Sequence, residues 1–138
     1  MALELDSLSK SVEVMRRSLQ VVEVNESRAD DDMLYTLRSG VIQNFEVAYE
    51  QCWKMMKRWL DNNLGSAYVD GVTRRELFRL AAEHQLIENV DRWMDYHYTR
   101  NETSHTYDGE SANVVYDSAK TFLQDAEKFL SRIRSRND

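Results

Sequence analysis

A short polar segment in the last third of the sequence holds the residues best suited to chemistry. Arg100, Asn101, His105 and Tyr107 fall within residues 96–109, which read YHYTRNETSHTYDG. Arginine offers a permanently charged fork that matches a phosphate group, and histidine can accept or donate a proton near neutral pH. Tyrosine supplies a hydroxyl that can bind a phosphate or be modified. The segment is therefore suited to holding a phosphate and moving a proton beside it.

The spacing of Arg100 and His105 limits how they can reach one ligand. They are five positions apart, so on one continuous helix they would point about 140° apart. They could converge if the helix ended between them, or if two subunits brought their copies together across an interface. Three residues in this stretch favour a helix ending: Asn101, Thr103 and Ser104. A purely structural interpretation also stands, in which Arg100 pairs with Glu102 or Asp95 and His105 caps a helix end.

The elements that must position this segment are predicted to be helices. The sequence has 138 residues, of which 42% are hydrophobic and 30% charged, with four glycines and no proline. Because proline and glycine break helices and build tight hairpin turns, their scarcity favours an all-α fold. The length suits one hydrophobic core, and we expect a single domain over residues 1–138.

Periodic apolar residues predict four main helical segments. The first covers about residues 5–22 and the second about residues 32–62, with the acidic residues 30–32 favouring the start of the second. Thr73 and Glu76 form a capping box that opens the third helix, and helical spacing resumes at residues 90–97. Ser111 is expected to cap the last helix, which continues to Ile133. A bundle of four or five helices is the simplest arrangement.

The long second segment carries two further signals. Gly40 lies inside it and is expected to permit the close approach of another helix. Trp53 and Met56 fall off its main apolar stripe. Because a second apolar strip on the longest helix of a bundle is usually buried in another chain, these two residues favour dimerisation.

The overall charge argues against a protein that grips long nucleic acids. The net charge is −6 at pH 7, whereas binding through many phosphates usually requires a basic excess or stripe. A few positive groups could still hold a nucleotide or the end of an RNA. Three local basic clusters are interpreted as solvated helix faces: Lys54, Lys57 and Arg58; Arg74, Arg75 and Arg79; and Lys128, Arg132, Arg134 and Arg136.

Cysteine and histidine usage predicts neither a disulfide nor a metal site. Cys52 is the single cysteine, which points to a reducing compartment, and its place on an apolar stripe indicates packing. Together with His84, His97 and His105 it lacks the tight spacing of a zinc site, so we expect no metal and no cofactor. No signal peptide opens the sequence and no apolar run approaches membrane-spanning length. We therefore expect a soluble cytoplasmic protein with no membrane association.

Two stretches resemble a known family. Residues 41–54 (VIQNFEVAYEQCWK) and residues 100–108 (RNETSHTYD) look like the nucleotidyltransferase substrate-binding family, which lies within the HEPN superfamily of helical domains. The order of elements between the two stretches also matches, so the resemblance covers nearly the whole sequence. An Arg-x-x-x-x-His pattern alone is weakly specific. The extended pattern Arg-Asn-x-x-Ser-His-Thr-Tyr-Asp, joined to the aromatic helix before it, is strongly specific.

The resemblance implies an up-and-down helical bundle that dimerises and forms a complex with a separately encoded minimal nucleotidyltransferase. In related pairs the helical protein is a metal-independent ribonuclease toxin, and the transferase is an antitoxin that can attach adenylyl groups to the motif tyrosine. By position, Arg100 and His105 become the candidate catalytic residues of such a ribonuclease. Arg100, Asn101, His105 and Tyr107 become candidate residues for binding a nucleotide or RNA, and Tyr107 the candidate modification site.

The chain is predicted to be the partner of the transferase rather than the transferase itself. A minimal nucleotidyltransferase needs a Gly-Ser turn followed by an Asp-x-Asp pair that holds Mg²⁺. Here the Asp30-x-Asp32 pair precedes Gly65–Ser66, in a sequence with no readable strands. Three residues of the matching second helix are expected to provide support or an interface rather than chemistry: Glu46, Tyr49 and Trp53. The expected function is that of a substrate-binding subunit, with the ribonuclease as the alternative.

Overall fold

A computed structural model describes residues 2–102 and 109–137, with only the backbone at residues 109–111. All regular structure in these two ranges is helical, which confirms the predicted all-α class. The helices are α1 (Asp6–Asn25), α2 (Asp31–Leu64), α3 (Ser66–Val69), α4 (Arg74–Glu83), α5 (Val90–Glu102) and α6 (Gly109–Ser135). The predicted four- to five-helix bundle is therefore present, with the single-turn α3 added in the connector after α2.

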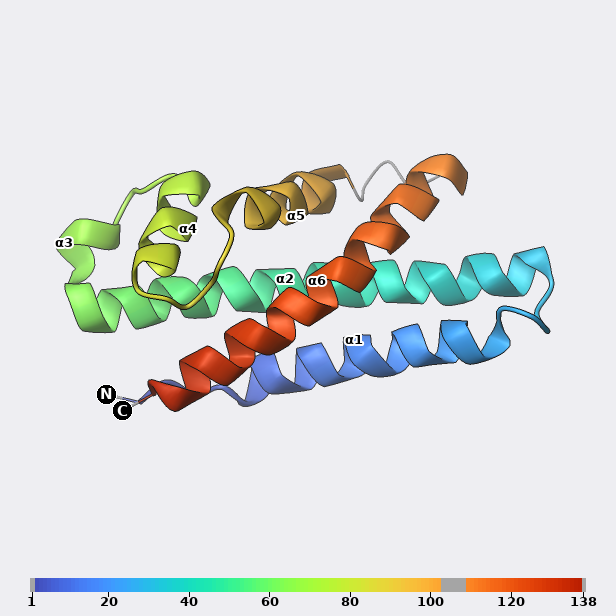
Figure 1. Ribbon diagram of the computed structural model, residues 1–138, viewed down its shortest axis with the longest axis horizontal. Coiled ribbons are helices and arrows are strands. Elements are labelled where there is room, and N and C mark those ends of the chain that lie inside the picture. Colours follow the sequence, from blue (N-terminus) through green and yellow to red (C-terminus); the bar gives the residue numbers. More distant parts are fainter. Residues whose placement is uncertain (1, 103–108, 138) are drawn as a thin grey trace.

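The long helices α1, α2 and α6 form the body of the molecule (Figure 1). Helices α1 and α2 run antiparallel, α6 crosses both, α5 lies along α2, and α4 contacts α2 while running across it in this view. The two ends of the chain lie together at one end of the bundle, whereas α5 meets α6 toward the other. Across the part of the chain that the structure describes, no helix combines the length and apolar character needed to cross a membrane.

Helix α2 is the central element because its apolar stripe contacts most of the other helices. Asp30 caps its start by accepting a hydrogen bond from the backbone N–H of Met33 at 2.8 Å. Gly65 ends it with a φ of +94°, a conformation that favours glycine. Gly40 does not have the predicted role, because a Cβ there would meet nothing within 4 Å. Among the described residues, no close helix approach depends on Gly40.

The starts of α4 and α6 can be compared with the capping residues predicted from the sequence. Thr73 caps α4 as predicted, since its side chain accepts a hydrogen bond from the backbone N–H of Glu76 at 3.1 Å. The last helix begins at Gly109 rather than after Ser111. Ser111 therefore lies inside the first turn of α6, and the prediction that it precedes the helix as its cap was wrong.

Aromatic side chains join α2, α4, α5 and α6 at the centre of the core. Trp93 of α5 is 2% exposed, and its ring centroid lies 5.6 Å from that of Phe122 in α6. Phe45 of α2 contacts the Phe122 ring edge-on, with 5.1 Å between the ring centroids. The ring centroid of Phe78 in α4 lies 5.8 Å from that of Trp93. Such tilted and edge-on pairs add to the stabilisation that burial of the rings provides. This cluster fixes α5, and with it Arg100, against α2.

Hydrogen bonds also stabilise the end of the bundle where the two ends of the chain lie. The Asn137 side chain accepts from the backbone N–H of Leu3 at 2.6 Å and donates to the carbonyl of Leu3 at 2.9 Å. The indole N–H of Trp59 in α2 donates to the carbonyl of Arg136 at 3.2 Å. These bonds hold the end of α6 against α2 and the segment before α1.

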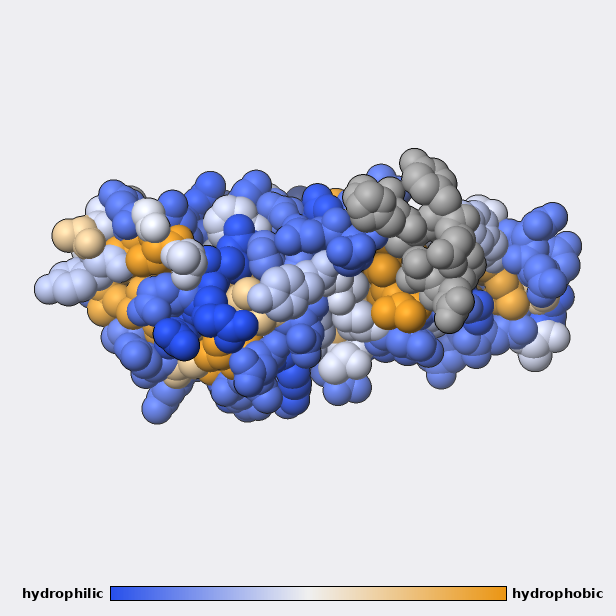
Figure 2. All heavy atoms as spheres, turned by 90° about the horizontal axis from the view of Figure 1, so that it is seen from above, coloured by the Kyte–Doolittle hydropathy of each residue, from blue (hydrophilic) through white to orange (hydrophobic). Residues whose placement is uncertain are grey.

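The surface over α3, α4 and α5 is mostly hydrophilic (Figure 2). Apolar side chains show in small areas at the α3–α4 end and beside the grey atoms, and polar side chains separate these areas.

Candidate functional site

Arg100 lies near the end of α5 and faces two carboxylates of α2. Its Nη1 atom is 3.9 Å from Oε2 of Glu46, and its Nε atom is 3.7 Å from Oε1 of Glu50. About a third of its side chain is exposed. The structural interpretation that paired Arg100 with Glu102 or Asp95 was therefore wrong. Two turns of α2 hold the guanidinium, and a ligand phosphate would have to compete with both carboxylates.

A hydrogen-bonded group of three residues lies one helical turn before Arg100. The hydroxyl of Tyr49 in α2 is 2.9 Å from Nδ1 of His97 in α5. Arg74, the first residue of α4, donates from Nη1 to the same hydroxyl at 2.9 Å. Tyr49 is fully buried. Three helices thus converge on one buried hydroxyl.

The electrostatic setting of this group favours its uncharged forms. Desolvation lowers the pKa of His97 below its usual range, and the neighbouring Arg74 guanidinium lowers it further, while Glu50 acts in the opposite direction. Burial raises the pKa of the Tyr49 hydroxyl well above its ordinary value despite the opposing effect of Arg74. Near neutral pH, His97 is therefore an uncharged imidazole and Tyr49 an uncharged phenol.

Trp53 connects this group to Arg100. The guanidinium carbon of Arg74 lies 3.7 Å from the centroid of the Trp53 ring system, a close cation–π contact. The indole N–H of Trp53 donates to Oε2 of Glu50 at 3.0 Å, and Glu50 is also a partner of Arg100. One continuous cluster therefore joins the start of α4 to the end of α5 across α2. We call it the α2–α4–α5 cluster, and it comprises Glu46, Tyr49, Glu50, Trp53, Arg74, His97 and Arg100.

The cluster also corrects the argument for a dimer. Met56 is fully buried, and Trp53 is partly buried against the core and covered by Arg74. Met56 is thus buried within its own chain and Trp53 partly so, and this strip does not by itself argue for a partner copy. Glu46, Tyr49 and Trp53 have the supporting contacts that the sequence predicted for them.

Of the four predicted site residues, the structure places Arg100 and Asn101. Asn101 is exposed, and its Nδ2 atom lies 3.5 Å from Nε2 of His97. His105 and Tyr107 belong to residues 103–108, outside the described residues. His97 and Arg74 were not among the predicted residues. The i, i+3 and i, i+4 spacing of His97 to Arg100 and Asn101 could have revealed His97, because such residues share one helix face.

Cys52 lies on the buried side of α2 and takes no part in the cluster. It is fully buried, and burial raises the pKa of its thiol far above the usual range. It packs as the sequence predicted. In the two ranges that the structure describes, no three His, Cys, Asp or Glu side chains are grouped as a metal site requires.

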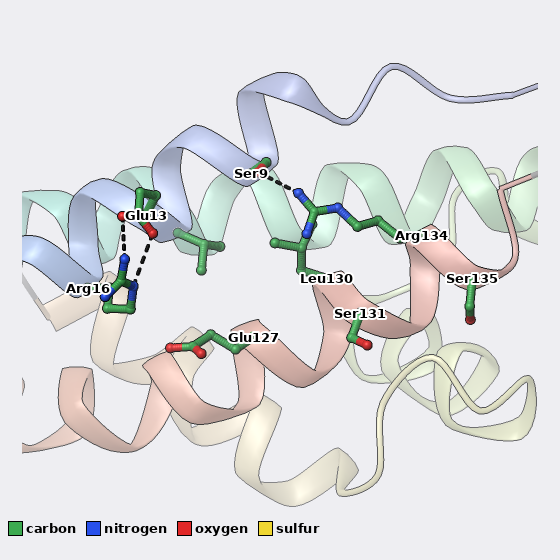
Figure 3. Close-up of a pocket in the computed structure, with 9 residues that line it drawn as sticks. Ser9, Glu13, Arg16, Glu127, Leu130, Ser131, Arg134 and Ser135 are labelled. Carbon is green, nitrogen blue, oxygen red and sulfur yellow. Dashed lines mark hydrogen bonds and ion pairs between the residues drawn. The ribbon is translucent and has the colours of Figure 1, made fainter.

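A groove between α1 and α6 is a further concave feature with charged walls (Figure 3). It has a volume of about 690 Å³, and its lining includes Glu13, Arg16 and Arg134. Two of its arginines already have partners: Arg16 Nε donates to Oε2 of Glu13 at 3.0 Å, and Arg134 donates to the Ser9 hydroxyl at 2.6 Å. It lies on α1 and α6, whereas Arg100 and Asn101 lie on α5. We therefore place the candidate site at the α2–α4–α5 cluster.

The fold and the cluster together define an all-helical bundle with an arginine-centred polar site at the end of its fifth helix. The chain belongs to the nucleotidyltransferase substrate binding protein like family, whose sequence profile matches residues 3–135. It is 38% identical over 103 residues to a Haemophilus influenzae protein named "Probable ribonuclease HepT". That alignment covers 74% of this chain and 70% of the relative.

Two solved structures share the fold of this chain. A Haemophilus influenzae structure, described as revealing the fold of a substrate-binding domain of a nucleotidyltransferase, matches with a TM-score of 0.89 at 29% identity. The match covers 95% of this chain and 99% of that one. A Thermus thermophilus structure matches with a TM-score of 0.66 at 23% identity, over 87% of this chain and 98% of the other. At that identity it shows a shared fold alone.

Proposed function

We propose that this chain is the substrate-binding partner subunit of a two-component nucleotidyltransferase system and forms a complex with a separately encoded minimal nucleotidyltransferase. The observation that carries the proposal is the family match over residues 3–135. The close structural likeness to a protein described as a substrate-binding domain of a nucleotidyltransferase supports it. In this proposal the subunit acts in the cytoplasm as a homodimer.

The proposed ligand site is the end of α5 and the polar segment that follows it. Arg100 and Asn101 hold a phosphate of the nucleotide or RNA, and His105 and Tyr107 complete the site. The surroundings of Arg100 support this role, because Glu46 and Glu50 orient its guanidinium while about a third of its side chain stays exposed. The net charge of −6 favours a ligand with few phosphates over a long nucleic acid.

Co-purification tests the partnership. The chain is expressed with a tag beside the small Gly-Ser…Asp-x-Asp protein encoded next to it, and the mass of the purified material is measured by light scattering. We expect a stable complex whose mass corresponds to two copies of this chain plus the transferase. A chain that purifies alone in the presence of an abundant, folded transferase contradicts the proposal, and a monomeric mass contradicts the homodimer.

A metal-independent ribonuclease is the second candidate, favoured by the relative named "Probable ribonuclease HepT". In this function a 2′-hydroxyl of the RNA attacks the adjacent phosphorus and the bond to the 5′-oxygen breaks. The products are a 2′,3′-cyclic phosphate and a 5′-hydroxyl end. Arg100 steadies the charge on the phosphate, and His105 moves the protons.

Cleavage of RNA in the presence of EDTA tests this candidate. We expect the wild-type chain to cut, and the Arg100→Ala and His105→Ala variants to lose at least about a hundredfold in rate, as for other acid–base and charge-stabilising groups. Arg75→Ala and His84→Ala are matched controls, because both lie on or beside α4 outside the cluster. Intact RNA with the wild-type chain, or full activity in both site variants, contradicts the assignment.

Adenylylation of Tyr107 is the proposed regulation of this activity. The Tyr107 hydroxyl would attack the α-phosphorus of ATP on the transferase, forming a tyrosyl-AMP ester and releasing pyrophosphate. Incubation with the transferase, ATP and Mg²⁺ should add one or more AMP masses to the wild-type chain and to Tyr98→Phe, whose exposed tyrosine precedes Tyr107 by nine positions in the sequence. Tyr107→Phe should gain none. An unchanged wild-type mass, or equal labelling of Tyr107→Phe, contradicts the modification.

A further inference from the structure

The fully buried hydroxyl of Tyr49 determines where the proton of His97 lies. This hydroxyl has two described neighbours, the Arg74 guanidinium and Nδ1 of His97, each at 2.9 Å. A guanidinium can only donate, so Tyr49 accepts from Arg74. Its own proton then has one described acceptor, the lone pair on Nδ1 of His97. This arrangement satisfies every group, and it leaves the single proton of the neutral imidazole on Nε2.

The opposite tautomer would leave a buried donor without an acceptor. If His97 carried its proton on Nδ1, Tyr49 would accept from both Arg74 and His97, and the phenol proton would face no described acceptor. Buried polar groups are rarely left in that state. The lowered pKa of His97 agrees with a neutral ring held in this way.

The Nε2 proton in turn orients Asn101. Nε2 lies 3.5 Å from the outer end of the Asn101 side chain, which is exposed and can rotate by 180° at little cost. With Nε2 as a donor, the amide presents its oxygen to His97, so its NH₂ group faces away from the imidazole. The NH₂ group is then free to donate outward from the exposed Asn101, at the same end of α5 as Arg100.

We infer that Arg74, Tyr49 and His97 are positioning residues that fix the Asn101 amide as a hydrogen-bond donor to a phosphate oxygen of the ligand. The inference rests on the proposed function for its ligand, a phosphate ester that can come from a free nucleotide or from RNA. Arg100 supplies the positive charge that attracts the phosphate, and Asn101 supplies a hydrogen bond of fixed direction to one of its oxygens. Arg74 acts from the start of α4 without touching the ligand, through Tyr49 and His97.

The tautomer of His97 can be measured directly. Long-range ¹H–¹⁵N spectra of the full chain distinguish protonated from bare ring nitrogens, and His97→Gln assigns the signals among the three histidines. We expect a proton on Nε2 and a bare Nδ1 in the wild type, and a mixture of tautomers in Tyr49→Phe. Tyr98→Phe is the matched control, because its ring lies beside His97 with no hydrogen bond between them among those described. A proton on Nδ1 in the wild type, or an unchanged tautomer in Tyr49→Phe, overturns the relay.

Binding measurements test the link to the ligand. The probes are ATP and a short 2′-O-methyl RNA, which cannot be cleaved by attack of a 2′-hydroxyl. We expect Arg74→Met and Asn101→Ala each to weaken binding roughly threefold to tenfold, the weight of one hydrogen bond. The double variant should be no weaker than the weaker single variant, because both changes act through one amide. Arg75→Met, whose arginine pairs with Asp91 outside the cluster, should bind as the wild type does.

Each outcome separates the inference from the proposed function. Loss of ATP binding alone assigns the site to a nucleotide, and loss of RNA binding alone assigns it to RNA. Additive losses, or full binding by Arg74→Met, overturn the relay even when the wild type binds well. If the wild-type chain binds neither probe, the proposed function and the ligand role of Asn101 both fail. The tautomer measurement then decides the arrangement of Arg74, Tyr49 and His97 by itself.

Discussion

Arg92 of α5 and Asp125 of α6 form a two-point ion pair that ties the first turn of α5 to the second half of α6. Arg92 Nε donates to Oδ2 of Asp125 at 3.0 Å, and Nη2 contacts the other carboxylate oxygen. The Tyr96 hydroxyl also donates to Asp125, which is 6% exposed. The pairing raises the pKa of Arg92, and desolvation together with Asp125 raises the pKa of Tyr96. The carboxylate therefore serves two donors on α5.

Replacement of this carboxylate should weaken the packing of α5 against α6. We expect Asp125→Asn to lower the free energy of unfolding by about 1–3 kcal/mol, because it removes the charge and leaves a buried donor facing other donors. Urea denaturation followed by circular dichroism measures the loss. Asp117→Asn is the matched control on the same helix, since that carboxylate is exposed and pairs with Lys120; it should change stability by less than about 0.5 kcal/mol. An equal loss of free energy of unfolding in Asp125→Asn and Asp117→Asn would show that the buried pair stabilises the fold no more than the exposed pair.

The carboxylates around Arg100 should limit its affinity for phosphate. We expect the double variant Glu46→Gln, Glu50→Gln to bind ATP or 2′-O-methyl RNA roughly threefold to tenfold more tightly, since partly exposed ion pairs are each worth up to about 1 kcal/mol. Glutamine keeps an oxygen that can accept from the Trp53 indole. Glu88→Gln is the control, because Glu88 pairs with Arg132 and Lys128 away from the site. Weaker binding by the double variant would mean that the carboxylates orient Arg100 more than they compete for it.

The depressed pKa of His97 makes stability depend on pH. In the unfolded chain His97 has its ordinary pKa of about 6.5, and in the folded chain its pKa is lower. As the pH falls through this value, the unfolded state takes up the proton first, so the contribution of His97 to stability is present above it and is lost below it. The charged groups that act on the ring in the folded chain are Arg74 and Glu50.

Unfolding in urea at about pH 7.5 and about pH 5.5 measures that dependence. The wild-type chain should lose more stability on acidification than His97→Gln, because all other groups titrate alike in the two proteins. His84→Gln should behave as the wild type does. A larger loss in His97→Gln than in the wild type would reverse the sign and contradict a neutral His97 in the fold.

Gly40 inside α2 and Gly65 just after its end should respond in opposite ways to replacement by alanine. Gly40 lies within the helix, and its added Cβ meets nothing within 4 Å, so Gly40→Ala should stabilise the chain by about 0.5–1 kcal/mol. Gly65 ends the helix with φ +94°, so Gly65→Ala should destabilise it by about 1–3 kcal/mol. Thermal unfolding of both variants gives the comparison. A destabilising Gly40→Ala would indicate a neighbour at that position, such as a second copy of the chain.

Local patterns predicted the helices well because their causes are local. The apolar periodicity of α2 and the capping residues Asp30 and Thr73 depend on neighbours within one turn, and the structure confirms them. The roles of Gly40, Trp53 and Met56 depend on what other helices place beside them. Sequence spacing carries no such information: Gly40 meets no neighbour within 4 Å among the described residues, and Met56 is buried within its own chain.

The candidate site likewise combines residues that the sequence motif indicates with contacts that only the packing of the helices creates. The motif and the family resemblance identified Arg100 and Asn101, but the partners of Arg100 are Glu46 and Glu50, on a helix separated from it in the chain by α3 and α4. Arg74 belonged to a basic cluster interpreted as solvated, yet it stacks on Trp53 and donates to Tyr49. Only the packing of α4 and α5 against α2 brings these residues together.

The three tryptophans of the chain occupy three different surroundings, which gives the molecule built-in optical reporters. Trp93 lies within the aromatic core, and Trp59 bonds to the end of α6. Trp53 lies under the Arg74 guanidinium and beside Glu50. With Trp59 and Trp93 replaced by phenylalanine, the emission of Trp53 would report changes in the cluster without an attached dye. Ligand arrival could then be followed in real time, separately from unfolding.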